Sequence, residues 1–172
     1  MPYAASLVDW VHWFAVFALM AALIAAALSD ITTYLIPHRY SAAIAIAFLV
    51  FAIGRPLPFL LGGLAAATLL FAIGALLFAR HLLGGGDVKL LAATGLWAGF
   101  DLLVLLVFAA AVAGGVLALA QLSPLGRLLP APARPGGAPV GNDFYSRMRQ
   151  PMPFGVAIAL GGVCVAVARL VA

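Results

Sequence analysis

The sequence has very little charge and only one cysteine. Charged residues make up 8% of its 172 residues, whereas a soluble domain carries roughly a quarter. A chain this poor in charge cannot cover a surface that faces water, which excludes a soluble globular protein. The single cysteine, Cys164, excludes an internal disulfide and a cysteine-based zinc site. We expect it to be a small buried hydrophobic residue.

Long apolar runs take the place of charge, because 66% of the residues are hydrophobic. We predict an all-α polytopic membrane protein, a single domain over residues 1–172 with about six transmembrane helices. The second and fourth apolar runs are shorter than the roughly 17 residues that a span needs, so they require tilt or shelter among neighbouring helices. The expected spans are residues 11–29, 40–53, 58–79, 88–100, 102–120 and 154–171.

The distribution of basic residues predicts the orientation. No Lys or Arg precedes Arg39, so the first apolar run is a span rather than a cleavable signal. Residues 121–151 are rich in proline and glycine, which predicts an exposed loop. An outside N-terminus and C-terminus leave only Arg55 and Arg169 on the outer side. The cytoplasmic side then receives Arg39, Arg80, Lys89, Arg127, Arg134, Arg147 and Arg149. The scattered basic residues indicate the membrane topology and give no reason to expect nucleic acid as a partner.

Two of the five acidic residues stand apart, and all five are aspartates. Asp30 directly follows the first apolar run, and Asp87 lies just before the fourth. The predicted topology brings both to the same cytoplasmic boundary. A carboxylate at membrane depth is costly and therefore indicates function. Asp9 and Asp101 fall at the outer boundary and Asp143 in the long loop, where we expect them to be solvated.

Two facing carboxyl groups suit peptide hydrolysis. Close together they share one proton, so the ionised group can take a proton from water while the protonated group donates to the carbonyl oxygen. This chemistry needs no cofactor and no metal. Taken alone, each of the two aspartates could also have a purely structural role. Asp87 follows three glycines before a helix, as an N-cap does, and Asp30 could simply end a helix at the interface.

The residues around these aspartates also bear on function. Gly84, Gly85 and Gly86 form a strip without side chains, along which an extended peptide backbone could lie, although a flexible hinge would look the same. Lys89 could act on a nearby carboxylate or anchor at lipid headgroups. Pro37 fixes the turn after Asp30, and we expect the neighbouring His38 to be a polar boundary residue rather than a catalyst.

Three segments of the chain resemble a known family. GGGDVK at residues 84–89 is similar to the GxGD motif of aspartyl intramembrane proteases. DITTYLIPH at residues 30–38 resembles the first-aspartate region of bacterial type IV prepilin peptidases. Met152, Pro153, Phe154 and Gly155 resemble that family's Pro-Phe-Gly element. The resemblance implies that Asp30 and Asp87 are the catalytic pair and that the glycines belong to the motif.

The resemblance also implies a substrate and a cellular location for the cleavage. Members of the family cut the leader peptide from pilin or pseudopilin precursors at the cytoplasmic face of the bacterial inner membrane. The paired CxxC zinc ligands of the larger members are missing here, so we expect no N-methylation of the trimmed pilin. The short form looks like the minimal peptidases of the tight-adherence (Flp pilus) system. It departs from the pattern at His38, where an Asn is usual, and at Val156, where many members have a second Pro.

Two other functions are compatible with the same residues. Membrane carboxylates also relay protons, as in a proton-coupled transporter or a small channel subunit. The sequence shows neither an inverted repeat nor an acidic residue in the middle of a span, which argues against that function. Alternatively, the aspartates only cap helices, and the protein is a non-catalytic subunit for pilus or secretion assembly.

Overall fold

The computed structural model describes residues 7–123 and 152–171, and this part of the chain is entirely helical outside its turns. The prediction of an all-α protein is confirmed for these residues. The helices are α1 (Leu7–Thr33), α2 (His38–Phe51), α3 (Leu57–Ala79), α4 (Gly85–Ala98), α5 (Leu103–Leu122) and α7 (Phe154–Val171). Helix α5 continues two residues into the predicted loop at 121–151. From residue 124 on, that loop, with Asp143 and its four arginines, lies outside the described residues.

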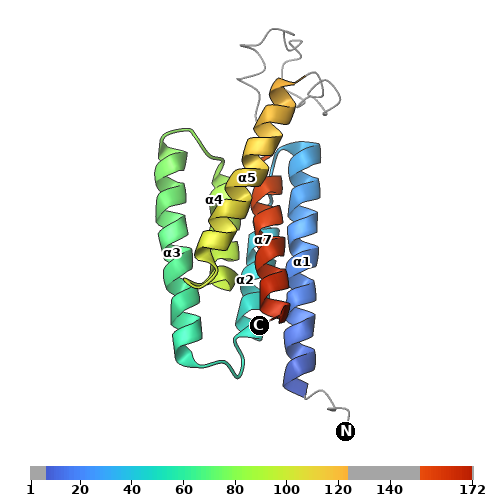
Figure 1. The fold of residues 1–172 in the computed structure, drawn as a ribbon, viewed down its shortest axis with the longest axis vertical. Coiled ribbons are helices and arrows are strands. Elements are labelled where there is room, and N and C mark those ends of the chain that lie inside the picture. The colour runs from blue at the N-terminus through green and yellow to red at the C-terminus, as the bar shows by residue number, and fades with distance from the viewer. Residues whose placement is uncertain (1–6, 124–151, 172) are drawn as a thin grey trace.

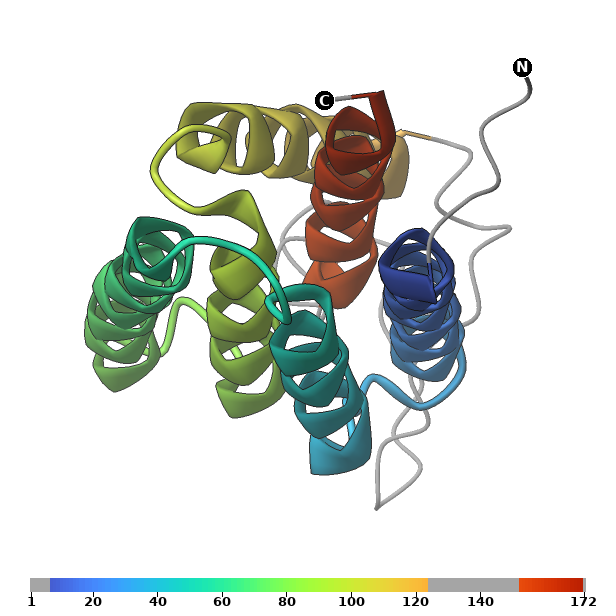
Figure 2. The same cartoon turned by 90° about the horizontal axis from the view of Figure 1, so that it is seen from below.

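The lengths of the helices fit a membrane protein. Four of the described helices, α1, α3, α5 and α7, are long and apolar enough to cross a bilayer. Helices α2 and α4 have 14 residues each, which is less than the roughly 17 that a span needs. Helix α4 is sheltered by its neighbours, as predicted for a short apolar run, because it packs against α2, α3, α5 and α7 (Figure 2).

The order of the helices brings distant segments to one end of the bundle. The end of α1 and the beginnings of α4 and α7 lie in the upper part of Figure 1, whereas α1 begins and α7 ends in its lower part. Helix α7 packs against α1, α4 and α5, and α3 lies at the outside of the bundle against α4. The bundle therefore has an upper end at which three separate segments of the sequence meet.

Small residues allow these helices to approach closely. A Cβ on Gly63 of α3 would lie 2.6 Å from the backbone oxygen of Leu96 on α4, and one on Gly161 of α7 would lie 2.8 Å from that of Leu106 on α5. Lipid tails are as apolar as leucine, so helices in a bilayer associate through such close packing. Gly63 and Gly161 therefore serve close helix packing, whereas a Cβ on Gly62 or Gly115 would meet nothing within 4 Å.

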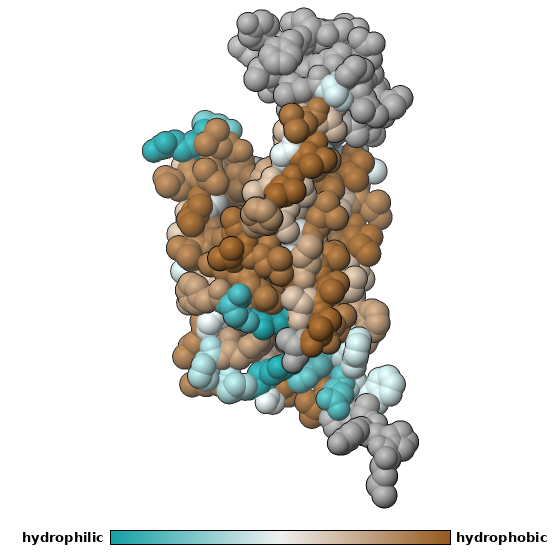
Figure 3. Space-filling model, in the orientation of Figure 1, coloured by the Kyte–Doolittle hydropathy of each residue, from teal (hydrophilic) through white to brown (hydrophobic). Residues whose placement is uncertain are grey.

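The outer surface of the bundle is apolar. Figure 3 shows a visible side that is hydrophobic over most of its height, with hydrophilic residues gathered mainly toward its lower end. Large exposed hydrophobic residues include Val104 (78% exposed) and Phe108 (67% exposed), both on α5. Cys164 is exposed on α7, so its prediction as a buried residue is wrong. Its helix turns this position away from the neighbouring helices.

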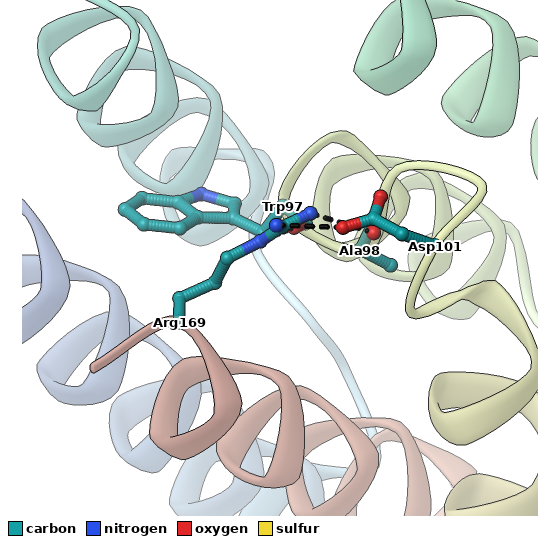
Figure 4. Close-up of polar contacts among 4 residues, drawn as sticks. All are labelled: Trp97, Ala98, Asp101 and Arg169. Carbon is teal, nitrogen blue, oxygen red and sulfur yellow. Dashed lines mark hydrogen bonds and ion pairs between the residues drawn. The ribbon is translucent and has the colours of Figure 1, made fainter. Parts of the chain in front are cut away.

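The C-terminal end of α4 lies inside the bundle, where water cannot satisfy its carbonyl groups. Arg169 of α7 supplies the missing donors (Figure 4). Its guanidinium donates to the carbonyl oxygens of Trp97 at 3.0 Å and Ala98 at 2.9 Å, and it forms an ion pair with Asp101 at 2.7 Å. The Trp97 ring is fully buried, and its Nε1 donates to the Ile44 oxygen at 3.0 Å. Helix α4 thus ends on a cationic cap from α7.

Removing this cap should destabilise the bundle. We expect Arg169→Met to lower the free energy of unfolding by about 2 kcal/mol, because two partly buried carbonyl groups lose a charged donor. Asp101→Asn is the matched control. It weakens only the ion pair to an exposed side chain, which contributes less than about 1 kcal/mol. Unfolding in detergent micelles measures both, and an equal effect of the two variants would contradict the capping role.

Candidate active site

Asp30 lies inside α1, one turn before its end, and not after the helix as the sequence suggested. The helix continues through Thr33, and Asp30 is only 4% exposed. Its Oδ2 accepts a hydrogen bond from the backbone N–H of Gly155 at 2.7 Å, and the N–H of Val156 also interacts with this carboxyl group. A buried carboxylate needs such donors. The interpretation of Asp30 as a simple interfacial helix end is therefore wrong.

The beginning of α7 is shaped to meet Asp30. Pro153 is buried and directly precedes the helix, and Phe154 is its first residue. A proline there leaves no orphaned N–H, and the free N–H groups of the first turn favour an anion. A Cβ on Gly155 would lie 2.8 Å from Oδ2 of Asp30. Glycine is thus required at this position because the carboxylate takes the space of a side chain.

The turn between α1 and α2 is fastened to α1 by hydroxyl groups. Ser29 Oγ donates to the Leu35 oxygen at 2.8 Å, and Thr33 Oγ1 donates to the Ser29 oxygen at 2.8 Å. Tyr34, the residue after α1, has a positive φ of 52°. Pro37 is the N-cap residue of α2. The turn therefore leaves Ile36 buried directly beside the end of α1.

Asp87 is the third residue of α4 and not its N-cap, as the sequence suggested. The N-cap is Gly84, whose backbone N–H donates to Oδ2 of Asp87 at 3.2 Å. The side chain thus satisfies the helix terminus from the N3 position, as in half of a capping box. Its other oxygen, Oδ1, is buried and has no hydrogen-bond partner among the described residues.

The glycines before Asp87 allow α4 to approach the α1–α2 turn. A Cβ on Gly86 would lie 3.0 Å from Cβ of Ile36 and 3.2 Å from its backbone oxygen. None of Gly84, Gly85 and Gly86 has a positive φ, so close approach rather than unusual backbone geometry explains Gly86. All three glycines also line a cavity, as a strip for a peptide backbone would.

This cavity joins the two aspartates. It has a volume of about 520 Å³, and both Asp30 and Asp87 line it. One wall is formed by α3 through Phe71, Ala75 and Phe78, and the remaining surface is largely apolar. The other lining residues come from the α1–α2 turn and the beginnings of α2 and α4: Tyr34, Leu35, Ile36, His38, Gly84, Gly85, Gly86, Val88 and Lys89.

The two carboxyl groups differ in their surroundings. Asp87 lies outside the four long apolar helices. Burial of its carboxyl group, with a smaller contribution from the charge of Asp30, raises the pKa of Asp87 to about 6, although the hydrogen bond from Gly84 acts in the opposite direction. Near neutral pH this group can therefore hold or release a proton, as an acid or base in catalysis must.

Lys89 and His38 form a polar pair at the edge of the cavity. Lys89 Nζ lies 3.4 Å from Nδ1 of His38, and both side chains are exposed. His38 is thus a polar residue at the edge of the site, where the sequence suggested a boundary residue. The contact links the beginnings of α2 and α4.

The cavity also contains residues that the sequence did not single out. Tyr34 lies between the first aspartate and Pro37, and only its place within the resembling segment could have drawn attention to it. Phe71 and Phe78 belong to a uniformly apolar helix. No pattern in such a helix distinguishes a residue that faces a cavity from one that faces lipid.

Comparison with known proteins gives one result. The sequence model of the type IV leader peptidase family matches residues 17–119 of the chain. The matched range contains both Asp30 and Asp87 and ends before α7. No curated protein and no solved structure matches the chain.

A side chain at position 155 should disturb the site. We expect Gly155→Ala to lower the free energy of unfolding by about 1–3 kcal/mol, because the added methyl group overlaps the Asp30 carboxylate in a tightly packed region. Gly115→Ala is the matched control, since a Cβ there meets nothing within 4 Å. It should be neutral or stabilising by up to about 1 kcal/mol from helix propensity. Thermal unfolding in detergent measures the difference, and a Gly155→Ala protein as stable as the control would contradict the geometry described.

Proposed function

The chain belongs to the type IV leader peptidase family, and we propose that it is an aspartic endopeptidase that removes the leader peptide of Flp-type prepilins. The observation that carries the proposal is the shared cavity of Asp30 and Asp87. Both residues lie within the range matched by the family, and the rest of the cavity is apolar enough to receive a hydrophobic peptide.

The surroundings of the two aspartates suggest their roles. Asp30 accepts backbone N–H groups at the beginning of α7, an arrangement that favours a negative charge, so it is the ionised member that takes a proton from the attacking water. Asp87, whose pKa lies near 6, is the protonated member. It gives its proton to the carbonyl oxygen of the scissile peptide. The proton held by Asp30 then passes to the leaving amine, and the proton on the oxygen returns to Asp87.

The proposal includes a cellular location for the site, which the distribution of basic residues supports. Asp30, Asp87 and the beginning of α7 lie toward one end of the bundle. Arg39 is the second residue of α2, and Arg80 directly follows α3. The positive-inside rule then puts this end at the cytoplasmic face of the bacterial inner membrane, with both termini outside. Residues 1–172 form a single peptidase domain in this proposal. One cysteine cannot supply the paired CxxC zinc ligands of a methyltransferase region, so the domain cleaves without N-methylation.

Removing either catalytic carboxylate should stop cleavage. We expect Asp30→Asn and Asp87→Asn each to lower the rate of prepilin processing by about 10²–10⁴-fold, which is the usual contribution of a general acid or base. Asp101→Asn, which changes an exposed aspartate outside the cavity, is the matched control and should process normally. Co-expression with a Flp-type prepilin and a gel assay of its size measure the effect. Normal processing by both cavity variants would refute the catalytic pair and favour a non-catalytic assembly subunit.

The rate should depend on pH in a bell-shaped manner. Because Asp87 must be protonated and its pKa is about 6, kcat/KM should fall about tenfold per pH unit well above pH 6. At low pH it should fall again as Asp30 takes up a proton. Initial rates of the purified enzyme between about pH 4 and about pH 8 test this. A rate that stays constant over the whole range would exclude the sharing of one proton by the pair.

A further inference from the structure

Tyr34 occupies a backbone conformation that normally belongs to glycine. It is the first residue after α1, its backbone N–H donates to the backbone carbonyl oxygen of Asp30 at 2.9 Å, and its φ is 52°. Helices very often end with a left-handed residue, but that residue is usually glycine or asparagine, because a Cβ clashes with the following backbone there. A tyrosine at this position accepts strain that a glycine would avoid.

The turn around Tyr34 holds this conformation firmly. Thr33 Oγ1 donates to the Ser29 oxygen at 2.8 Å, and Ser29 Oγ donates to the Leu35 oxygen at 2.8 Å. Hydrogen bonds from the residues on both sides therefore fix the backbone of Tyr34. Strained residues that are held in this way cluster at functional sites.

Tyr34 belongs to the same cavity as the two aspartates. Tyr34 is half-buried and lines the cavity together with Asp30 and Asp87. Burial, followed by the negative charge of Asp30, raises the pKa of Tyr34. The phenol thus keeps its proton over the whole range in which the two carboxyl groups titrate, and it remains a hydrogen-bond donor.

The other polar side chains of the cavity have different partners. Lys89 and His38 contact each other at its edge, and the Asp87 carboxyl group accepts the N–H of Gly84. Among the described lining residues, Tyr34 is the only neutral hydroxyl group. A neutral donor beside two carboxyl groups is suited to an oxygen that gains negative charge during the reaction.

We propose that Tyr34 is a further catalytic residue, whose phenolic O–H donates a hydrogen bond to the oxygen of the scissile carbonyl group. The inference rests on the proposed function and adds a third group to it. Water forms the new C–O bond and gives one proton to Asp30, and Asp87 protonates the carbonyl oxygen. Tyr34 transfers no proton. It stabilises the charge on that oxygen before the proton from Asp87 arrives, and again as the C–N bond breaks.

Replacing Tyr34 with phenylalanine tests the inference, because the ring stays and only the donor is lost. We expect Tyr34→Phe to lower kcat for cleavage of a purified Flp-type prepilin by about 10²-fold, as loss of one such donor does, with KM changed less than about threefold. The matched control is Tyr40→Phe. Tyr40 is also half-buried, its hydroxyl contacts Arg39 at 3.1 Å, and it does not line the cavity. It should cleave at the normal rate.

The outcomes separate this inference from the function on which it rests. If Asp30→Asn and Asp87→Asn are inactive while Tyr34→Phe matches Tyr40→Phe, the role of Tyr34 is refuted and the peptidase is not. A raised KM with normal kcat would also refute it, since Tyr34 would then only bind substrate. Glycine suits the left-handed backbone, so Tyr34→Gly should keep the thermal unfolding midpoint of the unmodified protein. Its kcat should nevertheless be lowered, because the phenol is missing. Full activity of this variant would show that Tyr34 only ends the helix.

Discussion

The hydrogen bond from the Gly155 N–H to Oδ2 of Asp30 is the contact on which the site depends. A carboxylate with only 4% of its surface exposed must find donors inside the protein. At 2.7 Å the beginning of α7 provides one, and the polarity of a helix N-terminus adds to it. Because α7 also packs against α4 and α5, the bond ties Asp30 to the centre of the bundle. The close contact leaves room only for glycine at position 155.

Ile36 connects this contact to the second aspartate. Cβ atoms built on Gly155 of α7 and on Gly86 of α4 would both collide with Ile36, which lies in the turn after α1. The two helix beginnings therefore pack against one buried residue, and Asp30 and Asp87 are positioned from the same turn. A flexible hinge at the three glycines, one of the readings that the sequence left open, does not fit this packing at Gly86. A Cβ on Gly84 would lie 2.8 Å from Oδ2 of Asp87, whereas one on Gly85 would meet only the ring of Phe78 at 3.4 Å.

The sequence predicted the class and the helices, and it singled out both aspartates that line the cavity. It failed where polar side chains form hydrogen bonds with the backbone. Apolar runs locate a helix, but the residues Ile31, Thr32 and Thr33 do not look like a membrane span. The hydroxyl groups of Thr32 and Thr33 donate to carbonyl oxygens within α1, and the helix continues beyond Asp30 to Thr33. Likewise, Asp87 satisfies the helix terminus from the third position rather than from the N-cap. The wall formed by Phe71 and Phe78 could not be predicted, because α3 is apolar on every side.

The short length of α4 follows from the polar groups at its two ends. Its first turn carries Asp87 into the cavity, and its last carbonyl groups accept hydrogen bonds from Arg169 of α7. The same helix α7 offers its N-terminus to Asp30 and its C-terminal arginine to the end of α4. A shift of α4 along the bundle would expose its carbonyl groups to an apolar environment at one end and separate Asp87 from Asp30 at the other. The cap from Arg169 and the cavity of the two aspartates are therefore two parts of one constraint, which holds Asp87 at a fixed depth relative to Asp30.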